Sequence, residues 1–163
     1  MAKYTALTSQ KNIPTLEGAK PTLSNASFYL QNTVYMSTTP HAAGGALLTV
    51  NDVVPLIDLP VGVMPVRAWR RVLTANDGAA AATIDVGVYK SSDDSAVDAD
   101  GLIAAADAKA AAGVTTLGAG AMLATVGFKP AAEASFIGAS MAVAATAASV
   151  VPRIQVIVEC VAV

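Results

Sequence analysis

Short runs of alternating hydrophobic and polar residues, separated by turn-forming residues, make up most of the chain. Such runs indicate half-buried β-strands, because successive side chains of a strand point to opposite faces of a sheet. Seven to nine strands of this kind follow one another without βαβ alternation and without a repeat of fixed period. The pattern therefore predicts a mainly β protein, an antiparallel β-sandwich or jelly roll. The clearest runs are SFYLQNTVYM (27–36), MPVRAWRRVLT (64–74), ATIDVGVYK (82–90) and PRIQVIVECVAV (152–163).

For two of the strands the sequence also indicates whether they lie in the middle or at the edge of a sheet. Residues 152–163 are apolar on both alternating faces, which is typical of a strand that is central or covered on both sides. Residues 46–63 contain Pro55 and Pro60 within short apolar runs. Because proline has no N–H for a sheet ladder, this segment is expected to form an edge strand or to contain a bulge.

Residues 64–90 look like a long β-hairpin. Two alternating runs flank an Asn-Asp-Gly sequence at 76–78, which is a strong turn signal. Within the first run, Trp69, Arg70 and Arg71 are neighbours, and neighbours in a strand point to opposite faces. We expect one arginine at the surface and the tryptophan in or near the core.

One helix is predicted, at about residues 101–112. The segment is rich in alanine, the strongest helix former, and Gly113 suits a left-handed C-cap. Asp98 or Asp100 would serve as the N-cap, and the other acids would favour the positive end of the helix dipole. Residues 93–95 would then be a solvated loop.

The same acids allow an alternative interpretation as a calcium loop. With Gly101 at the sixth position of such a loop, Asp98, Asp100 and Asp107 fall on the third, fifth and twelfth positions. The first position would be Ala96, which offers no side-chain ligand, and a strand precedes the loop where a helix is required. The helix-capping interpretation explains more, so neither a metal site nor a cofactor is predicted.

The domain organisation is simple. At 163 residues the chain suits one domain with a single core. Residues 1–25 mix Thr, Ser, Lys, Pro and isolated apolar residues without a period, and we expect them to form an extended N-terminal arm. Residues 26–163 would form the β-sandwich domain. Neither a signal peptide nor a membrane-spanning segment is expected, and the membrane is not a predicted partner.

Composition narrows the classes of partner. The net charge of −2 gives no basic face for nucleic acid, so direct nucleic-acid binding is not expected. Only 13% of the residues are charged, whereas 54% are hydrophobic and mostly Ala and Val. A surface with so few charges is typical of a subunit that lies against other molecules.

Catalytic residues are not indicated. His41 is the single histidine and lies in a turn-rich segment without a neighbouring nucleophile motif. The G-x-S-x-G nucleophile elbow and the phosphate-binding loop with its lysine are both missing from the sequence. Cys160 is the single cysteine and falls in an apolar strand, where a buried, inert thiol is expected. The prediction is a protein that is not an enzyme.

Residues 66–113 combine a strand, a turn, IDVGVY (84–89), the acidic step DADG (98–101) and an Ala-rich stretch. This layout resembles small structural proteins of tailed bacteriophages, above all the capsid decoration, or cement, proteins. The resemblance covers about a third of the chain and carries no catalytic residue over.

The resemblance implies a subunit, dimeric or trimeric, that sits on the outer capsid surface of the virion. It would bind the major capsid protein and other copies of itself, and stabilise the shell by bridging neighbouring capsomers. Two alternatives stay open: a tail or baseplate component of a virion, and a carbohydrate-binding β-sandwich. Exposed aromatic rings would be needed for the latter, and only 5% of the residues are aromatic.

Overall fold

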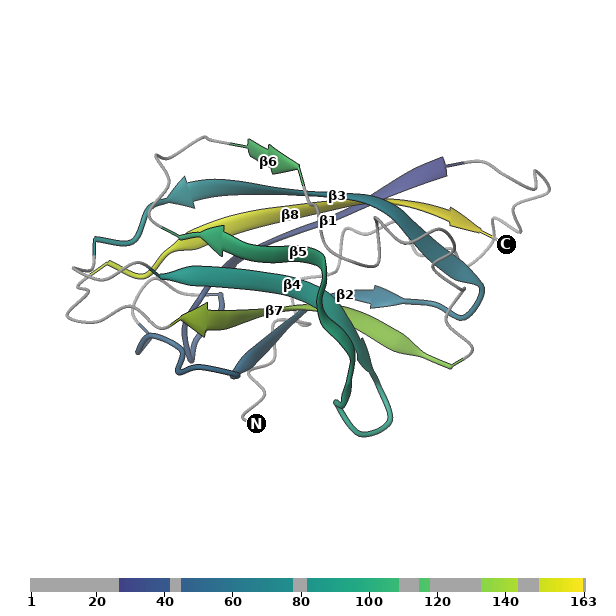
Figure 1. The fold of residues 1–163 in the computed structure, drawn as a ribbon, viewed down its shortest axis with the longest axis horizontal. Coiled ribbons are helices and arrows are strands. Elements are labelled where there is room, and N and C mark those ends of the chain that lie inside the picture. Colours follow the sequence, from purple (N-terminus) through teal and green to yellow (C-terminus); the bar gives the residue numbers. More distant parts are fainter. Residues whose placement is uncertain are drawn as a thin grey trace.

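The computed structural model describes residues 27–41, 45–77, 82–108, 115–117, 133–143 and 150–162. These residues form two four-stranded antiparallel sheets that lie in two layers (Figure 1). The predicted arm, residues 1–25, lies outside the described residues. The strands are β1 (Ser27–Tyr35), β2 (Val53–Leu59), β3 (Val63–Thr74), β4 (Thr83–Lys90), β5 (Ala96–Asp107), β6 (Thr115–Leu117), β7 (Ser135–Val143) and β8 (Arg153–Ala162).

The strands pair in a nested order. β4 pairs with β5, β3 with β6, β2 with β7 and β1 with β8, each time antiparallel. One sheet has the order β1-β8-β3-β6, and we name it the β8 sheet; the other has the order β2-β7-β4-β5, and we name it the β4 sheet. The chain therefore runs as one long antiparallel hairpin that is rolled so that successive strands lie in different layers, except β4 and β5, which are neighbours in one sheet.

The core lies between the two sheets. Alternate residues of β8, from Ile154 to Cys160, are fully buried, and Ile84, Val86 and Val88 of β4 are buried from the opposite layer. They belong to one continuous cluster of buried apolar side chains. Each fully buried Val, Leu or Ile side chain contributes about 1.5–3 kcal/mol relative to an exposed one, so this cluster is the main source of stability.

The structure confirms the mainly β prediction and the places predicted for two strands. β8 lies in the interior of its sheet, between β1 and β3. β2 is an edge strand of the β4 sheet, and its register with β7 shifts between Pro55 and Ile57. Both results follow from the pattern itself, because proline interrupts a ladder and a strand with two apolar faces needs cover on both.

Two sequence predictions are wrong. The helix expected at about 101–112 is a strand as far as Asp107, the end of β5, and residues 109–112 lie outside the described residues. The hairpin expected over 64–90 does not form, because β3 belongs to the β8 sheet and β4 to the β4 sheet. Pairing of β5 with β4 overrides the helix propensity of its alanines.

Among the described residues, no helix is long and apolar enough to cross a membrane.

The chain passes from one layer to the other through a tight turn between β2 and β3. The N–H of Val63 donates to the carbonyl of Pro60, and Gly62 has a φ of 80°. This is the arrangement of a type II turn, which needs a left-handed residue at its third position. A side-chain bond also links the layers, since Asn32 Nδ2 donates to the carbonyl of Leu56 at 2.7 Å.

Candidate functional site

The two conspicuous motifs of the sequence, IDVGVY and DADG, meet where β5 crosses β4. Val88 pairs with Asp98, and Val86 pairs with Ile103, so a single β4 residue, Gly87, lies opposite a four-residue bulge of β5. A Cβ atom on Gly87 would overlap the carbonyl oxygen of Asp98 and the backbone of the next residue. Glycine is therefore required at this position, because the β5 backbone lies directly on it.

Asp85 fixes the other side of the bulge. Its carboxylate accepts a hydrogen bond of 2.6 Å from the backbone N–H of Ala105. Ala105 has a φ of 46°, in the left-handed region that alanine rarely adopts. The carboxylate thus holds a strained residue of β5 in place. Burial raises the pKa of Asp85, the bond from Ala105 opposes this shift, and the charge of Asp100 adds to it.

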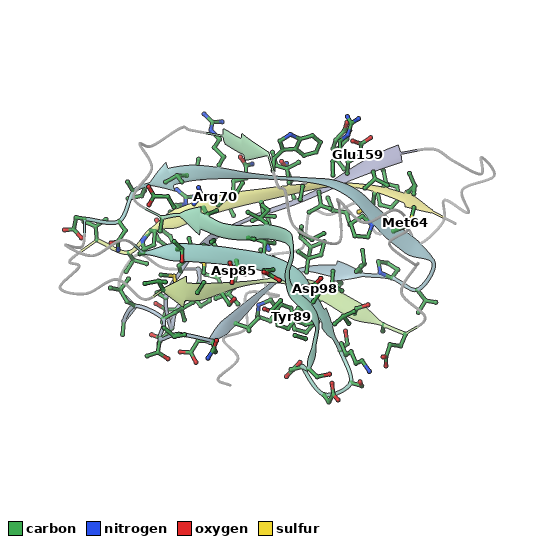
Figure 2. All side chains as sticks on the ribbon, viewed as in Figure 1. Met64, Arg70, Asp85, Tyr89, Asp98 and Glu159 are labelled. Carbon is green, nitrogen blue, oxygen red and sulfur yellow. The ribbon has the colours of Figure 1, made fainter. Side chains whose placement is uncertain are left out.

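Asp85, Asp98 and Asp100 form an acid group at this crossing. Burial raises the pKa of Asp98, and so do a side-chain hydrogen bond with Asp100 and the charge of that residue. Figure 2 shows Asp85 and Asp98 close together where β4 and β5 cross, with Tyr89 below them. The carboxyl groups of Asp98 and Asp100 are hydrogen-bonded to each other, and two carboxyl groups so placed favour a shared proton.

The acid group is not a calcium loop. That alternative needs Asp98 and Asp107 around one ion, but Asp98 pairs with Val88 whereas Asp107 pairs with Thr83 at the other end of β4. Within the described ranges, no group of three or more His, Cys, Asp or Glu side chains is arranged to hold a metal. The helix-capping role predicted for Asp98 or Asp100 is also wrong, since both lie inside β5.

A small apolar cluster covers the outer face of the β4 sheet beside the acid group. The rings of Tyr89 and Phe136 are stacked, with centroids 5.4 Å apart and planes 13° apart. Val53 completes the cluster, and a Cβ on Gly138 would come within 2.8 Å of a Val53 methyl group. Burial raises the pKa of the Tyr89 hydroxyl, which is hydrogen-bonded to the side chain of Ser140. The cluster anchors the base of the β4–β5 hairpin.

The β4–β5 hairpin, residues 90–98, projects from the body on the side away from the β8 sheet (Figure 1). In its turn, Asp93 Oδ1 accepts bonds from the N–H of Ser95 at 3.0 Å and from its hydroxyl at 2.6 Å. These bonds lower the pKa of Asp93. Lys90 forms an ion pair of 3.1 Å with Glu133 at the base of the hairpin. Residues 93–95 thus form the predicted loop, in which Asp93 is exposed and Asp94 and Ser95 are half-buried.

The outer face of the β8 sheet has the opposite character. Tyr29 is 61% exposed and lies 6.2 Å from Trp69, with the ring planes tilted by 41°. The Arg67 guanidinium is 4.0 Å from the carboxylate of Glu159. Arg71 is exposed on the same face. The face therefore combines accessible aromatic rings with positive charge.

Arg70 is the residue that the sequence prediction missed. Its side chain is 1% exposed and lies between the layers, where Nη1 donates to the carbonyl of Asp107 at 2.6 Å and Nε has no partner. Desolvation lowers the pKa of this guanidinium, and the charge of Asp107 partly opposes that shift. An exposed arginine was expected, and Arg71 is one; the expectation of Trp69 in or near the core is wrong.

The remaining reactive side chains are Cys160 and His41. Cys160 is buried, as expected, and burial raises the pKa of its thiol to about 12. A thiol with this pKa holds its proton at neutral pH, and the thiolate is the nucleophilic form. His41 is exposed at the surface.

No family model matches the sequence, and a search of curated proteins finds none of similar sequence. Among solved structures, a chain from "Capsid of Ralstonia phage GP4" has the same fold with a TM-score of 0.65 at 19% identity, and covers 89% of this chain and 90% of its own length. A chain from "Cyanophage Pam1 capsid asymmetric unit" gives 0.55 at 16% identity, covering 89% and 92%. A third, from "Acidic stable capsid structure of Helicobacter pylori bacteriophage KHP30", gives 0.51 at 15%, covering 85% and 90%.

These matches show a shared fold. Each one spans nearly the whole of both chains, so the three neighbours are chains of about the same length as this protein. The fold resemblance therefore concerns the complete two-sheet body and not a small common element.

Proposed function

We propose that this protein is a bacteriophage virion structural protein, a decoration or cement subunit that binds the outer capsid surface and stabilises the shell by bridging neighbouring capsomers. The observation that carries the proposal is the whole-chain likeness in fold to three chains from structures of phage capsids. It agrees with the sequence resemblance, which rests on different information, namely IDVGVY and the acidic step that follows it.

The nested strand order supports this role. Pairing of β1 with β8, β2 with β7, β3 with β6 and β4 with β5 is the order of an eight-stranded jelly roll, and we assign that topology to the chain. A jelly roll provides two broad faces and projecting loops, and chemistry appears on it only where a site is added. A scaffolding role without catalysis fits this architecture.

The mechanism is burial of surface at subunit joints. A stable protein–protein interface buries about 1,600 Å² in total, shared by the two partners. The partners in this proposal are the major capsid protein and other copies of the chain, as a dimer or trimer. Large apolar side chains are exposed on the surface and could be buried at such an interface, including Tyr29 and Val61, each 61% exposed.

Attachment to particles tests the proposal. Purified protein is added to phage particles that have lost it, and the particles are heated while DNA release is followed by dye fluorescence. We expect the added protein to co-sediment with the particles and to raise the temperature of DNA release. Particles that neither bind the protein nor gain heat stability would contradict the decoration role. Gold labelling on the tail or baseplate would replace it with the tail alternative.

The predicted arm supplies a second test. We propose that residues 1–25 contribute to attachment and not to the folded core. Deletion of residues 1–25 is expected to reduce capsid occupancy and to leave the denaturant midpoint of the body unchanged. Full occupancy after the deletion would remove the arm from the mechanism.

A further inference from the structure

Charged side chains are segregated between the two sides of the molecule. On the outer face of the β8 sheet the described cations are Arg67, Arg71 and Arg153, with Glu159 as the acid. On the outer face of the β4 sheet and its hairpin, Lys90 is the cation, and the described acids are Asp58, Asp85, Asp93, Asp94, Asp98, Asp100, Asp107 and Glu133. One side is thus basic and the other strongly acidic.

The two sides also differ in shape and in what they expose. The acidic side ends in the projecting β4–β5 hairpin, whereas the basic side is the outer face of the β8 sheet (Figure 1). In Figure 2, Glu159 marks the basic side, and Asp98 and Tyr89 lie on the other. Val97 of the hairpin is 51% exposed, and Tyr29 of the basic face is 61% exposed. Each surface therefore offers one large apolar side chain to a partner.

We propose that the β4–β5 hairpin of one copy docks on the outer face of the β8 sheet of a second copy. Carboxylates of the hairpin meet the guanidinium groups of Arg67, Arg71 and Arg153, which match carboxylate geometry. The exposed Val97 packs near Tyr29 and Trp69. A guanidinium close to Asp98 and Asp100 also relieves the repulsion within the acid group.

The geometry determines the kind of assembly. The hairpin and the basic face lie on opposite sides of the body, so one chain cannot join them within itself. For the same reason two copies cannot exchange both contacts in a symmetric pair. The contact is therefore head-to-tail, and its closed form is a ring of more than two copies. This inference does not depend on the capsid role.

Substitutions that exchange the charges of the hairpin and of the β8-sheet face test the proposed contact. The assembly is measured by native mass spectrometry and by sedimentation at low and high salt, because screening shortens from about 8 Å at 0.15 M to about 3 Å at 1 M salt. The hairpin variant D94K/D98K and the face variant R71E/R153E each reverse the charge of their surface and are each expected to weaken association about tenfold or more. The combined variant carries both changes in one chain and is expected to regain association, because its hairpin and face attract again.

The control is Asp58→Lys, which removes an acid from the same sheet face but on β2, separated from β4 by β7. It is expected to leave association unchanged. Circular dichroism and the denaturant midpoint verify that each variant is folded. A wild-type chain that stays monomeric, a strict dimer, or a combined variant no better than its parents would each overturn the proposal. Equal loss from Asp58→Lys would reduce the effect to net charge and overturn it as well.

Discussion

Between β1 and β8 the register runs through nine residue pairs without a shift, whereas between β4 and β5 it shifts three times. The first pair belongs to a regular face whose aromatic and basic side chains simply follow from strand alternation. The second depends on single residues: Gly87 admits the crossing backbone, and Asp85 holds Ala105. One fold therefore presents both a sheet face and a projecting hairpin. Local exceptions to the strand pattern make the difference.

The largest effect is expected from Gly87→Val. A side chain there would overlap the β5 backbone, which cannot move without breaking the strand pairing, so we expect a loss of more than about 3 kcal/mol in unfolding free energy. Gly138→Val is the matched control: its Cβ would meet side chains and not backbone, a Val53 methyl group at 2.8 Å and two Tyr89 ring atoms at 3.0 Å, so a smaller loss is expected. Urea unfolding compares the two. Equal, small losses would show that the crossing is not tightly packed.

The next effect concerns Arg70. Arg70→Ala removes the bond to the Asp107 carbonyl and leaves a cavity between the layers, at a cost of about 2–4 kcal/mol. Arg70→Met keeps most of the buried stem without a charge, and it should stay within about 1.5 kcal/mol of the wild type. Thermal and urea unfolding of the two variants measure this difference. If the methionine variant were as unstable as the alanine variant, the guanidinium and not its stem would stabilise the joint.

The dependence of unfolding free energy on pH tests the acid group formed by Asp85, Asp98 and Asp100. The pKa values of Asp85 and Asp98 are raised in the folded protein, so the folded state binds these protons more tightly than the unfolded chain. The unfolding free energy should therefore increase as the pH falls from 7 toward 3.8, the usual pKa of Asp. At neutral pH both carboxyl groups are ionised, and their destabilising effect on the fold should be complete. Asp98→Asn should be more stable than the wild type at pH 7, with a flatter profile. If the unfolding free energies of the variant and the wild type changed with pH in parallel, the raised pKa of Asp98 would be contradicted.

The smallest effect is expected at the base of the hairpin. Lys90 and Glu133 form an exposed ion pair, and such pairs contribute little because water and salt screen them. Glu133→Gln should leave the urea midpoint unchanged within error. A clear loss would show that the pair holds the hairpin in place and that the Tyr89 stack does not suffice.

Much of the fold was predictable, and the failures have physical causes. Alternation and the prolines located β8 in the interior of its sheet and β2 at an edge. The helix at 101–112 was wrong because the intrinsic preference of alanine is weaker than pairing with β4 and burial of Leu102. Arg70 was missed because alternation says which residues share a face but not which face is buried.

The acid group was visible in the sequence, but its arrangement was not. Asp100 belongs to the four-residue bulge of β5 and links the group, because its charge acts on Asp85 of β4 and its carboxyl is hydrogen-bonded to Asp98. The signal that could have found the bulge is Gly87 in the middle of a strand rich in β-branched residues, since a glycine there indicates a bulge or a close backbone approach.

The most direct test of the capsid role is a cryo-electron-microscopy map of the virion that contains this protein. The account predicts the two-sheet body on the outer capsid surface, at joints between capsomers, with neighbouring copies in contact. A body located in the tail or baseplate, inside the shell, or missing from the particle would contradict it.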